Sequence, residues 1–117
     1  MSPTAHTLKS LRENDCIAEV VERWIPRTFI RKDLFGCIDI VAICGCKLIG
    51  INATDGTSHS KRVTKALATP AIAAWLGTGS GFEVWSWSLR GARGERKTYK
   101  VRVTSIVLNG NGKMIVL

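Results

Sequence analysis

The chain has 117 residues and a formal net charge of +8, from 17 Lys and Arg against nine Asp and Glu. Because this length leaves room for one hydrophobic core, we expect a single domain over residues 1–117, small enough to gain stability from forming a homodimer. No apolar run approaches the roughly 20 residues of a membrane-spanning helix, and the N-terminus lacks an apolar signal segment, so we expect no membrane partner and a cytoplasmic location.

The positive charge favours a polyanionic partner, with DNA as the first candidate, because Lys and Arg bind phosphates and release counterions. A solvated basic surface without a dedicated partner gives the same composition. A third class, an interaction protein whose basic surface meets an acidic protein, also fits the charge. A steep dependence of binding on salt would distinguish DNA from the other two.

Four cysteines (Cys16, Cys37, Cys44 and Cys46) raise the question of a disulfide framework or a zinc site. Cys44 and Cys46 lack the CxxC spacing of zinc sites, and no His lies nearby. We therefore expect free, mostly buried thiols.

The first half of the chain predicts one helix and three strands. Ser2-Pro3 can start a helix over residues 4–14, and Pro26 ends a strand predicted over residues 16–25. Residues 34–44 are almost continuously apolar, as in a central strand that is covered on both faces. Gly45 then makes a tight turn, so residues 34–44 and 47–53 should form an antiparallel hairpin.

The second half predicts a helix followed by further strands. Ser58 or Ser60 can cap the helix, and Pro70 should kink or divide it. Residues 82–89 alternate apolar and polar side chains, residues 97–108 form another strand, and the turn at residues 109–112 allows a short strand over residues 113–117. The order α-β-β-β-α-β-β is too irregular for a doubly wound dinucleotide-binding fold and predicts an α/β mixed sheet flanked by helices.

Two polar residues interrupt the apolar hairpin. Asp39 lies within GCIDIVAIC, and Asn52 lies within the partner strand, with Thr54 on the same face as Asn52. Facing positions in a hairpin bring side chains close, so we expect Asp39 within about 5 Å of Asn52. The alternative is a structural Asp–Asn pair that completes a buried hydrogen-bond network.

These elements and residues resemble the PD-(D/E)XK nuclease superfamily over about residues 4–89, especially small phage-type and Holliday-junction-resolvase-like members. Asp39, in CIDIVA, matches the acid of the PD half, and Asn52-Ala53-Thr54 stands at the (D/E)XK half. The resemblance implies a restriction-endonuclease-like fold and an endonuclease that hydrolyses DNA with Mg²⁺ or Mn²⁺, branched or flapped DNA included. The implied catalytic and metal-binding positions are Asp39, Asn52 and Thr54.

The chain departs from the superfamily at two of these positions. Asn52 replaces the carboxylate and brings no charge to Mg²⁺, and Thr54 replaces the lysine that would stabilise charge on the phosphate. Asp33 can compensate as a metal ligand and Glu22 as a catalytic acid, although Glu22 also fits an ordinary edge-strand charge. His6 can take part or be a solvated residue at a helix start. The alternative function is a catalytically degenerate nucleic-acid-binding module on the same fold.

Basic residues in two regions are candidates for DNA binding. Residues 90–117 carry seven Lys and Arg against Glu95 alone. Ser58 and the free N–H groups at the start of the second helix can also hold a phosphate. Trp85 and Trp87 share a strand face, where they either stack on unpaired bases or are buried against a helix or a dimer partner. The predicted DNA-binding residues are Arg31, Lys32, Ser58, Lys61, Arg62, Lys65, Arg93, Arg96 and Lys97.

Overall fold

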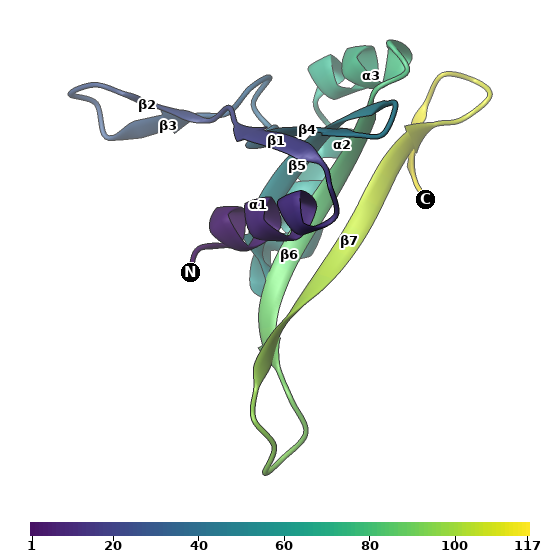
Figure 1. Ribbon diagram of the computed structural model, residues 1–117. Coiled ribbons are helices and arrows are strands. Elements are labelled where there is room, and N and C mark those ends of the chain that lie inside the picture. The colour runs from purple at the N-terminus through teal and green to yellow at the C-terminus, as the bar shows by residue number, and fades with distance from the viewer.

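A mixed sheet of six strands flanked by three helices organises the chain, and a separate two-stranded hairpin projects from it (Figure 1). The computed structural model describes residues 1–117. The elements are α1 (Pro3–Glu13), β1 (Ile17–Val20), β2 (Arg23–Ile25), β3 (Ile30–Lys32), β4 (Ile40–Cys44), β5 (Lys47–Asp55), the 3₁₀ turn η1 (Gly56–Ser58), α2 (His59–Leu67), α3 (Pro70–Gly77), β6 (Gly81–Arg90), β7 (Thr98–Leu108) and β8 (Met114–Val116).

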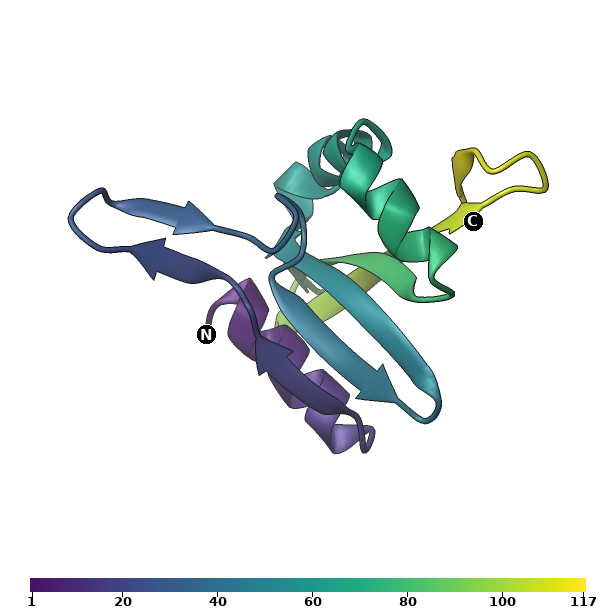
Figure 2. The same cartoon turned by 90° about the horizontal axis from the view of Figure 1, so that it is seen from above.

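The strand order in the sheet is β1-β4-β5-β6-β7-β8. All neighbours are antiparallel except β5 and β6, which are parallel because α2 and α3 carry the chain back across the sheet. Figure 2 shows α1 on one face and α2 with α3 on the other. No helix is long and apolar enough to cross a membrane.

Each face of the sheet has its own hydrophobic cluster. On the α1 face, Leu11 packs with Ile40 and Ile51. On the α2–α3 face, Ile72 packs with Ile38 and Phe82. Gly50 permits the close packing of this second cluster, since a Cβ there would lie 2.7 Å from Ile38 Cδ1. The sheet is therefore buried on both sides at its centre, where β4, β5 and β6 lie.

Much of the predicted element order is confirmed. The first helix, the β4–β5 hairpin, the division of the second helix at Pro70 and the last three strands are all present. The strand predicted over residues 16–25 is interrupted, because the N–H groups of Val21 and Glu22 both donate to Asp39 O, at 2.8 and 3.3 Å. The strand predicted over residues 34–44 begins only at Ile40, because Gly36, at φ +76°, closes a turn before it.

The prediction of four free thiols is wrong for two of them. Cys16 and Cys44 form a disulfide with a Cα–Cα distance of 4.5 Å. The pairing of β1 with β4 explains this, since Ile17 faces Ile43 and the register brings the two flanking cysteines opposite each other. Cys37 is a buried free thiol and Cys46 an exposed one.

Two hairpins project from the body of the molecule (Figure 1). One is the β2–β3 arm, residues 23–32, whose strands pair only with each other. The other is the β6–β7 tip, residues 89–99, the outer end of the longest ladder in the sheet. The radius of gyration is accordingly 14.9 Å, larger than the about 13 Å expected for a rounded domain of this length.

Candidate functional site

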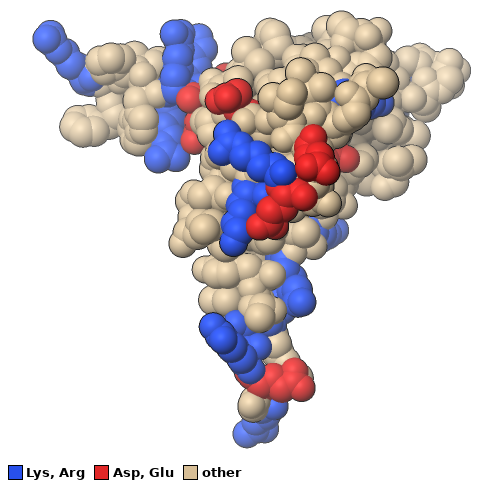
Figure 3. Space-filling view, in the orientation of Figure 1, with Lys and Arg blue, Asp and Glu red and all other residues tan.

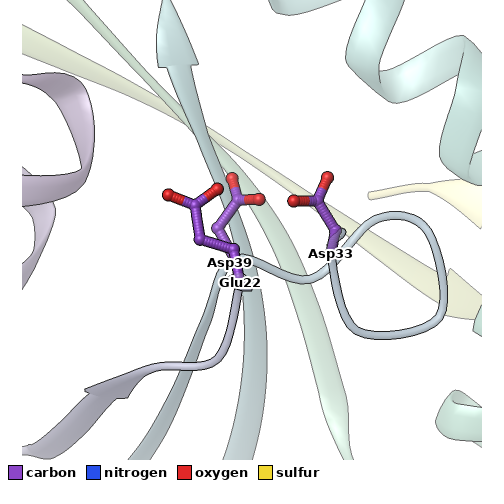
Figure 4. A group of neighbouring side chains, drawn as sticks. All are labelled: Glu22, Asp33 and Asp39. Atoms are coloured by element: carbon purple, nitrogen blue, oxygen red, sulfur yellow. The ribbon is translucent and has the colours of Figure 1, made fainter. Parts of the chain in front are cut away.

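Three carboxylates meet at the root of the β2–β3 arm. One oxygen each of Glu22, Asp33 and Asp39 lies within 4.8 Å of the other two. Figure 4 shows the three side chains pointing to the same side of the chain segments that carry them. Glu22 lies between β1 and β2, Asp33 directly follows β3, and Asp39 directly precedes β4. We refer to these three residues as the acid cluster.

Backbone hydrogen bonds of Asp39 assemble the acid cluster. Its carbonyl accepts from the N–H groups of Val21 and Glu22, and its own N–H donates to Ile51 O at 2.9 Å. Asp39 therefore ties the segment that carries Glu22 to the central strand β5. The turn that starts at Asp33, whose carbonyl accepts from Gly36 N at 3.2 Å, brings Asp33 back beside Asp39.

The carboxyl group of Asp39 is buried, with 4% of the residue exposed. Its Oδ2 accepts a hydrogen bond from Ala53 N at 2.9 Å, which fixes the orientation of the group. Burial, followed by the nearby carboxyls of Asp33 and Glu22, raises the pKa of Asp39 to about 8, although the bond from Ala53 acts in the opposite direction. At neutral pH the cluster on its own therefore holds a proton that a bound cation would displace.

A cavity of about 600 Å³ opens over the acid cluster. Its walls combine the cluster with the start of α1, the end of β5 and two arginines. Mixed charges of this kind suit a ligand that carries both anionic oxygens and a cation. The lining residues are Ser2, Pro3, Thr4, Val20, Glu22, Arg31, Asp33, Asp39, Ala53, Thr54, Asp55 and Arg62.

Arg31 connects the β2–β3 arm to the cavity. Its Nη1 lies 3.6 Å from Glu22 Oε1, and its guanidinium carbon lies 4.7 Å from the centre of the Trp24 ring. Trp24 and Arg31 face each other across the two strands of the arm. Contacts with a carboxylate and an aromatic face therefore hold this cation at the edge of the cavity.

Asn52 lies outside the cavity lining. It is 3% exposed, and its Nδ2 donates to Cys37 O at 2.7 Å, while its Oδ1 is buried without a partner. A bend at Asp39 explains the separate environments, because it breaks the alternation of the strand: Ile38 packs on the α2–α3 face and Ile40 on the α1 face. Asn52 therefore supports the backbone before Asp39, and its amide is engaged there.

The other predicted residues fall into three groups. Thr54, 5% exposed, and Arg62 line the cavity together with Arg31. Ser58 precedes α2 without a capping bond from its side chain, and its N–H donates to Asp55 Oδ1 at 3.1 Å, so Asp55 caps the turn η1 before the helix. The remaining cations are exposed on α2, on the β2–β3 arm and at the β6–β7 tip, where Figure 3 shows Lys and Arg gathered: Lys61 and Lys65, Lys32, and Arg93, Arg96 and Lys97.

Sequence reasoning missed two parts of the cavity wall. Asp55 lines it, and hydrogen bonds from Thr57 Oγ1 and Ser58 N lower the pKa of its carboxyl. The start of α1 lines it as well, with Ser2 accepting a hydrogen bond from Ala5 N at 3.1 Å. The signal for Asp55 is its position directly after the buried run of β5, whereas nothing in the local sequence places α1 near Asp39.

His6 and the tryptophans pack against each other rather than standing free in solvent. The His6 ring lies 5.1 Å from the Trp87 ring and 4.3 Å from the Tyr99 ring, and Trp87 Nε1 donates to Thr7 Oγ1 at 2.9 Å. His6 is therefore not a solvated residue at a helix start. Trp87 therefore packs against helix α1, as in the second of the two alternatives, burial against a helix rather than stacking on bases.

Comparisons with known proteins find no match: no family model, no characterised protein and no solved structure is similar to this chain.

Proposed function

We propose that this protein is an Mg²⁺- or Mn²⁺-dependent endonuclease that hydrolyses phosphodiester bonds of DNA at the acid cluster. The observation that carries the proposal is the meeting of Glu22, Asp33 and Asp39 within 4.8 Å, in a cavity that Arg31 and Arg62 also line. Carboxylates hold the cation of such an enzyme, and guanidinium groups bind the phosphate that it acts on.

The donor set fits a hard divalent cation. All three groups offer carboxylate oxygens, which Mg²⁺ and Mn²⁺ prefer. Two ligands on opposite sides of Mg²⁺ are about 4.2 Å apart, since each Mg–O distance is about 2.1 Å. Adjacent ligands are about 3 Å apart, so the three oxygens, which lie within 4.8 Å of one another, would move closer by up to about 2 Å to share one ion.

The residues of the chain divide the work. A cation bound by the acid cluster supplies Lewis-acid polarisation of the phosphate and makes an attacking water more acidic. Arg62 and Arg31 bind the flanking non-bridging oxygens, and Arg31 exchanges its long contact with Glu22 for the phosphate. Ala53 N holds Asp39 in one orientation throughout, which keeps the cluster pre-organised.

The restriction-endonuclease-like topology is part of the proposal. The antiparallel run β1-β4-β5, the helical crossover and the parallel strand β6 follow the order that the PD-(D/E)XK resemblance implies. Asp39 takes the position of the family's first acid. Glu22 and Asp33 provide the charge that Asn52 does not, because the amide of Asn52 is directed to Cys37 O.

A nucleic-acid-binding module without catalysis is the second candidate. It is favoured by the absence of a lysine from the residues that line the cavity, where Thr54 stands in place of the family's lysine. In that case the acid cluster would have only a structural role, and the basic surfaces would bind DNA without cleaving it.

The proposed enzyme works as a homodimer in the cytoplasm. Leu89, Tyr99, Val101 and Val103 are 53%, 45%, 41% and 43% exposed and share one face of the β6–β7 ladder. Cations in this ladder, such as Lys100, alternate onto the other face. Two chains that each carry +8 can therefore approach through a face without cations, and burial of these side chains would stabilise the pair.

The decisive experiment is a cleavage assay on linear, nicked, flapped and four-way DNA with Mg²⁺ or Mn²⁺. We expect metal-dependent cleavage by the native chain and at least a hundredfold loss in Asp39→Asn, which removes the most buried ligand charge. Binding measured in EDTA should survive, because the phosphate contacts lie elsewhere. Glu19→Gln removes an exposed carboxylate of β1 outside the cavity and should cleave normally. Salt-dependent binding without cleavage under either metal would instead support the binding module.

Asn52→Asp tests whether the family's missing acid can be restored. Because Asn52 Nδ2 donates to Cys37 O, the substitution would replace a buried donor by an acceptor, and we expect lower stability without faster cleavage. Thermal unfolding and the cleavage rate, measured on the same preparation, give the two answers. Faster cleavage in Asn52→Asp would show that position 52 reaches the metal after all.

A further inference from the structure

The β2–β3 arm combines cations with exposed aromatic and aliphatic side chains. Residues 23–32 contain four Lys and Arg and no acid. Trp24, Phe29 and Ile30 are 56%, 93% and 54% exposed. An apolar side chain as exposed as that of Phe29 is unfavourable in water unless something covers it in the working state of the protein.

The turn at the end of the arm holds Phe29 outward. Arg27 and Phe29 both adopt left-handed backbone conformations, at φ +68° and +54°. Thr28 closes the turn, with its Oγ1 donating to Ile25 O at 2.8 Å. Bulky side chains rarely occupy this region, and such outliers cluster where a residue is held in place for binding. The backbone therefore presents the Phe29 ring beyond the strands of its own hairpin.

Both faces of the arm interleave apolar groups with cations. On one face Trp24 lies beneath Arg31, and on the other Ile25 and Ile30 lie beside the pair Arg23–Lys32. Lysine is depleted at protein–protein interfaces, whereas surfaces that bind unpaired nucleic acid combine cations for the backbone with aromatic rings for the bases. The charge and composition of the arm therefore match nucleic acid better than a protein partner.

We propose that Phe29 stacks on unpaired bases of DNA, so that the arm selects DNA whose bases are already unstacked, such as a flap or a bulge, over intact duplex. This inference rests on the proposed nuclease, because the arm starts at the acid cluster. Arg31 lines the cavity, and Phe29 lies two residues before it, in the turn directly before β3.

Binding in EDTA tests the proposal without cleavage. The probes are one DNA sequence prepared as an intact duplex and as a flap, with 2-aminopurine near the junction. Phe29→Ala should weaken binding of the flap about 5- to 100-fold and remove the change in 2-aminopurine fluorescence, while binding of the duplex changes less than threefold. Phe29→Trp should bind like the native chain, and Phe29→Leu, which keeps an apolar group without a ring face, should behave like Phe29→Ala.

Phe35→Ala is the matched control. Phe35 is 51% exposed and lies outside the arm, with its ring 6.2 Å from that of Trp75, so its loss should leave the preference for the flap unchanged. Equal binding of flap and duplex by the native chain, or an unchanged preference in Phe29→Ala, overturns the inference. So does Phe29-dependent binding to anionic phospholipid vesicles without binding to DNA.

The inference and the nuclease proposal can fail separately. If the native chain cleaves DNA and Phe29→Ala binds and cleaves the flap equally well, only the role of Phe29 is wrong. If Phe29 governs binding of the flap but no metal supports cleavage, the chain is a binding module and the role of Phe29 stands.

Discussion

The β2–β3 arm and the β6–β7 tip are both basic hairpins, but they distribute their charge differently. The arm mixes cations with apolar side chains on each face, as the Trp24–Arg31 contact illustrates on one of them. The β6–β7 ladder separates them: Tyr99 and Val101 lie on the face that α1 covers further in, and Lys100 lies on the opposite face. A mixed face suits a ligand with both phosphates and bases, and a segregated face suits a protein surface.

The two hairpins also differ in what supports them. The arm emerges where the acid cluster is assembled, so Glu22 and Arg31 join the two. The β6–β7 tip is the outer end of a long ladder, and the inner part of that ladder contacts a buried histidine through two hydroxyl groups. Net charge alone would assign both hairpins to DNA, whereas their surroundings assign different tasks.

The largest expected effect on DNA binding comes from removing three cations from either hairpin. One triple variant changes Arg27, Arg31 and Lys32 to Ala. The other changes Arg93, Arg96 and Lys97 to Ala, so both variants lower the net charge by the same amount. If every cation contacts a phosphate, either triple variant should lower the slope of log affinity against log salt by about 2.7. The gain in affinity from 1 M to 0.1 M salt would then be roughly 500-fold smaller than in the native chain.

Cleavage at saturating protein separates the two sets. Only the arm set should slow the reaction, because Arg31 lines the cavity and no residue of the tip does. The measurements are binding by fluorescence anisotropy over a range of salt and single-turnover cleavage. Equal cleavage rates for the two triple variants would contradict the assignment of different tasks.

The outcome for the site shows where local sequence carries information. Asp39 could be singled out from sequence because a carboxylate within an apolar run is costly without a purpose. Asp33 and Glu22 were also candidates from the sequence, but their meeting with Asp39 could not be derived from it, since the proximity of Asp33 depends on the turn at Gly36, and that of Glu22 on the hydrogen bonds to Asp39 O. Both are long-range consequences of an interrupted strand, whereas sequence periodicity describes an uninterrupted one.

The interrupted strand also explains why Asn52 and Asp39 lie in separate environments. Strand alternation predicts that facing residues share a face, and this holds for β4 and β5 from Ile40 and Ile51 onward. The bend at Asp39 lies one residue before that register begins. The element order was easier to predict, because turn residues such as Pro70 mark boundaries without reference to distant parts of the chain.

Removal of the Cys16–Cys44 disulfide should loosen the root of the arm and leave the β6–β7 ladder unchanged. The bond spans 28 residues and joins the edge strand β1 to β4. Closing a loop of this length contributes roughly 3–4 kcal/mol to the free energy of unfolding. Cys16→Ser with Cys44→Ser should lose about that amount in chemical denaturation, with faster hydrogen exchange in residues 17–22.

Alkylation of the native protein under non-reducing conditions checks the starting state. It should label Cys37 after unfolding and Cys46 without unfolding, and neither partner of the disulfide. Full labelling of four thiols in protein taken directly from cytoplasm would show that the pair is reduced where we propose that the protein works. The double variant would then match the cellular form in stability.

The segregated face of the β6–β7 ladder predicts a dimer that a single lysine weakens. Val101→Lys places a charge in the centre of the apolar face and should raise the dimer dissociation constant at least tenfold, since burial of an unpaired charge is costly. Thr98→Lys adds the same charge to the same strand on the opposite face and should leave the constant unchanged. Sedimentation equilibrium compares the three. A monomeric native chain, or equal constants for both variants, would refute the dimer.

The acid cluster predicts a loss of stability as pH rises. The pKa of Asp39 is about 8 in the folded chain against 3.8 for a free carboxyl, so between these values the folded state holds a proton that the unfolded state has released. The contribution of Asp39 to the free energy of unfolding therefore falls as pH increases from about 4 to 8. Asp39→Asn should flatten this part of the profile, and Mg²⁺ should stabilise the native chain more at pH 8 than at pH 5, because it replaces the proton.

His59, beside the β6–β7 ladder, should have the opposite pH dependence. Its Nδ1 lies 2.6 Å from Ser86 Oγ and its Nε2 lies 2.7 Å from Thr104 Oγ1. Hydroxyl groups can accept from either ring nitrogen, so these partners do not themselves oppose protonation. Burial and then the charge of Arg102 lower the pKa of His59 below 6.5.

The unfolded chain therefore binds a proton at His59 before the folded chain does as pH falls. The contribution of His59 to the free energy of unfolding should decrease from about pH 6.5 downward, by at most about 1.4 kcal/mol per pH unit, until the folded histidine is protonated as well, and in this range it opposes the contribution of Asp39. His59→Gln removes this opposing contribution, so below pH 6.5 the free energy of unfolding should rise more steeply with falling pH than in the native chain, while the change between pH 6.5 and 8 that depends on Asp39 stays the same. Denaturant midpoints at half-unit steps from pH 4 to 9 measure both. A profile below pH 6.5 that is unchanged in His59→Gln would mean that folding leaves the proton affinity of the ring as it is in the unfolded chain.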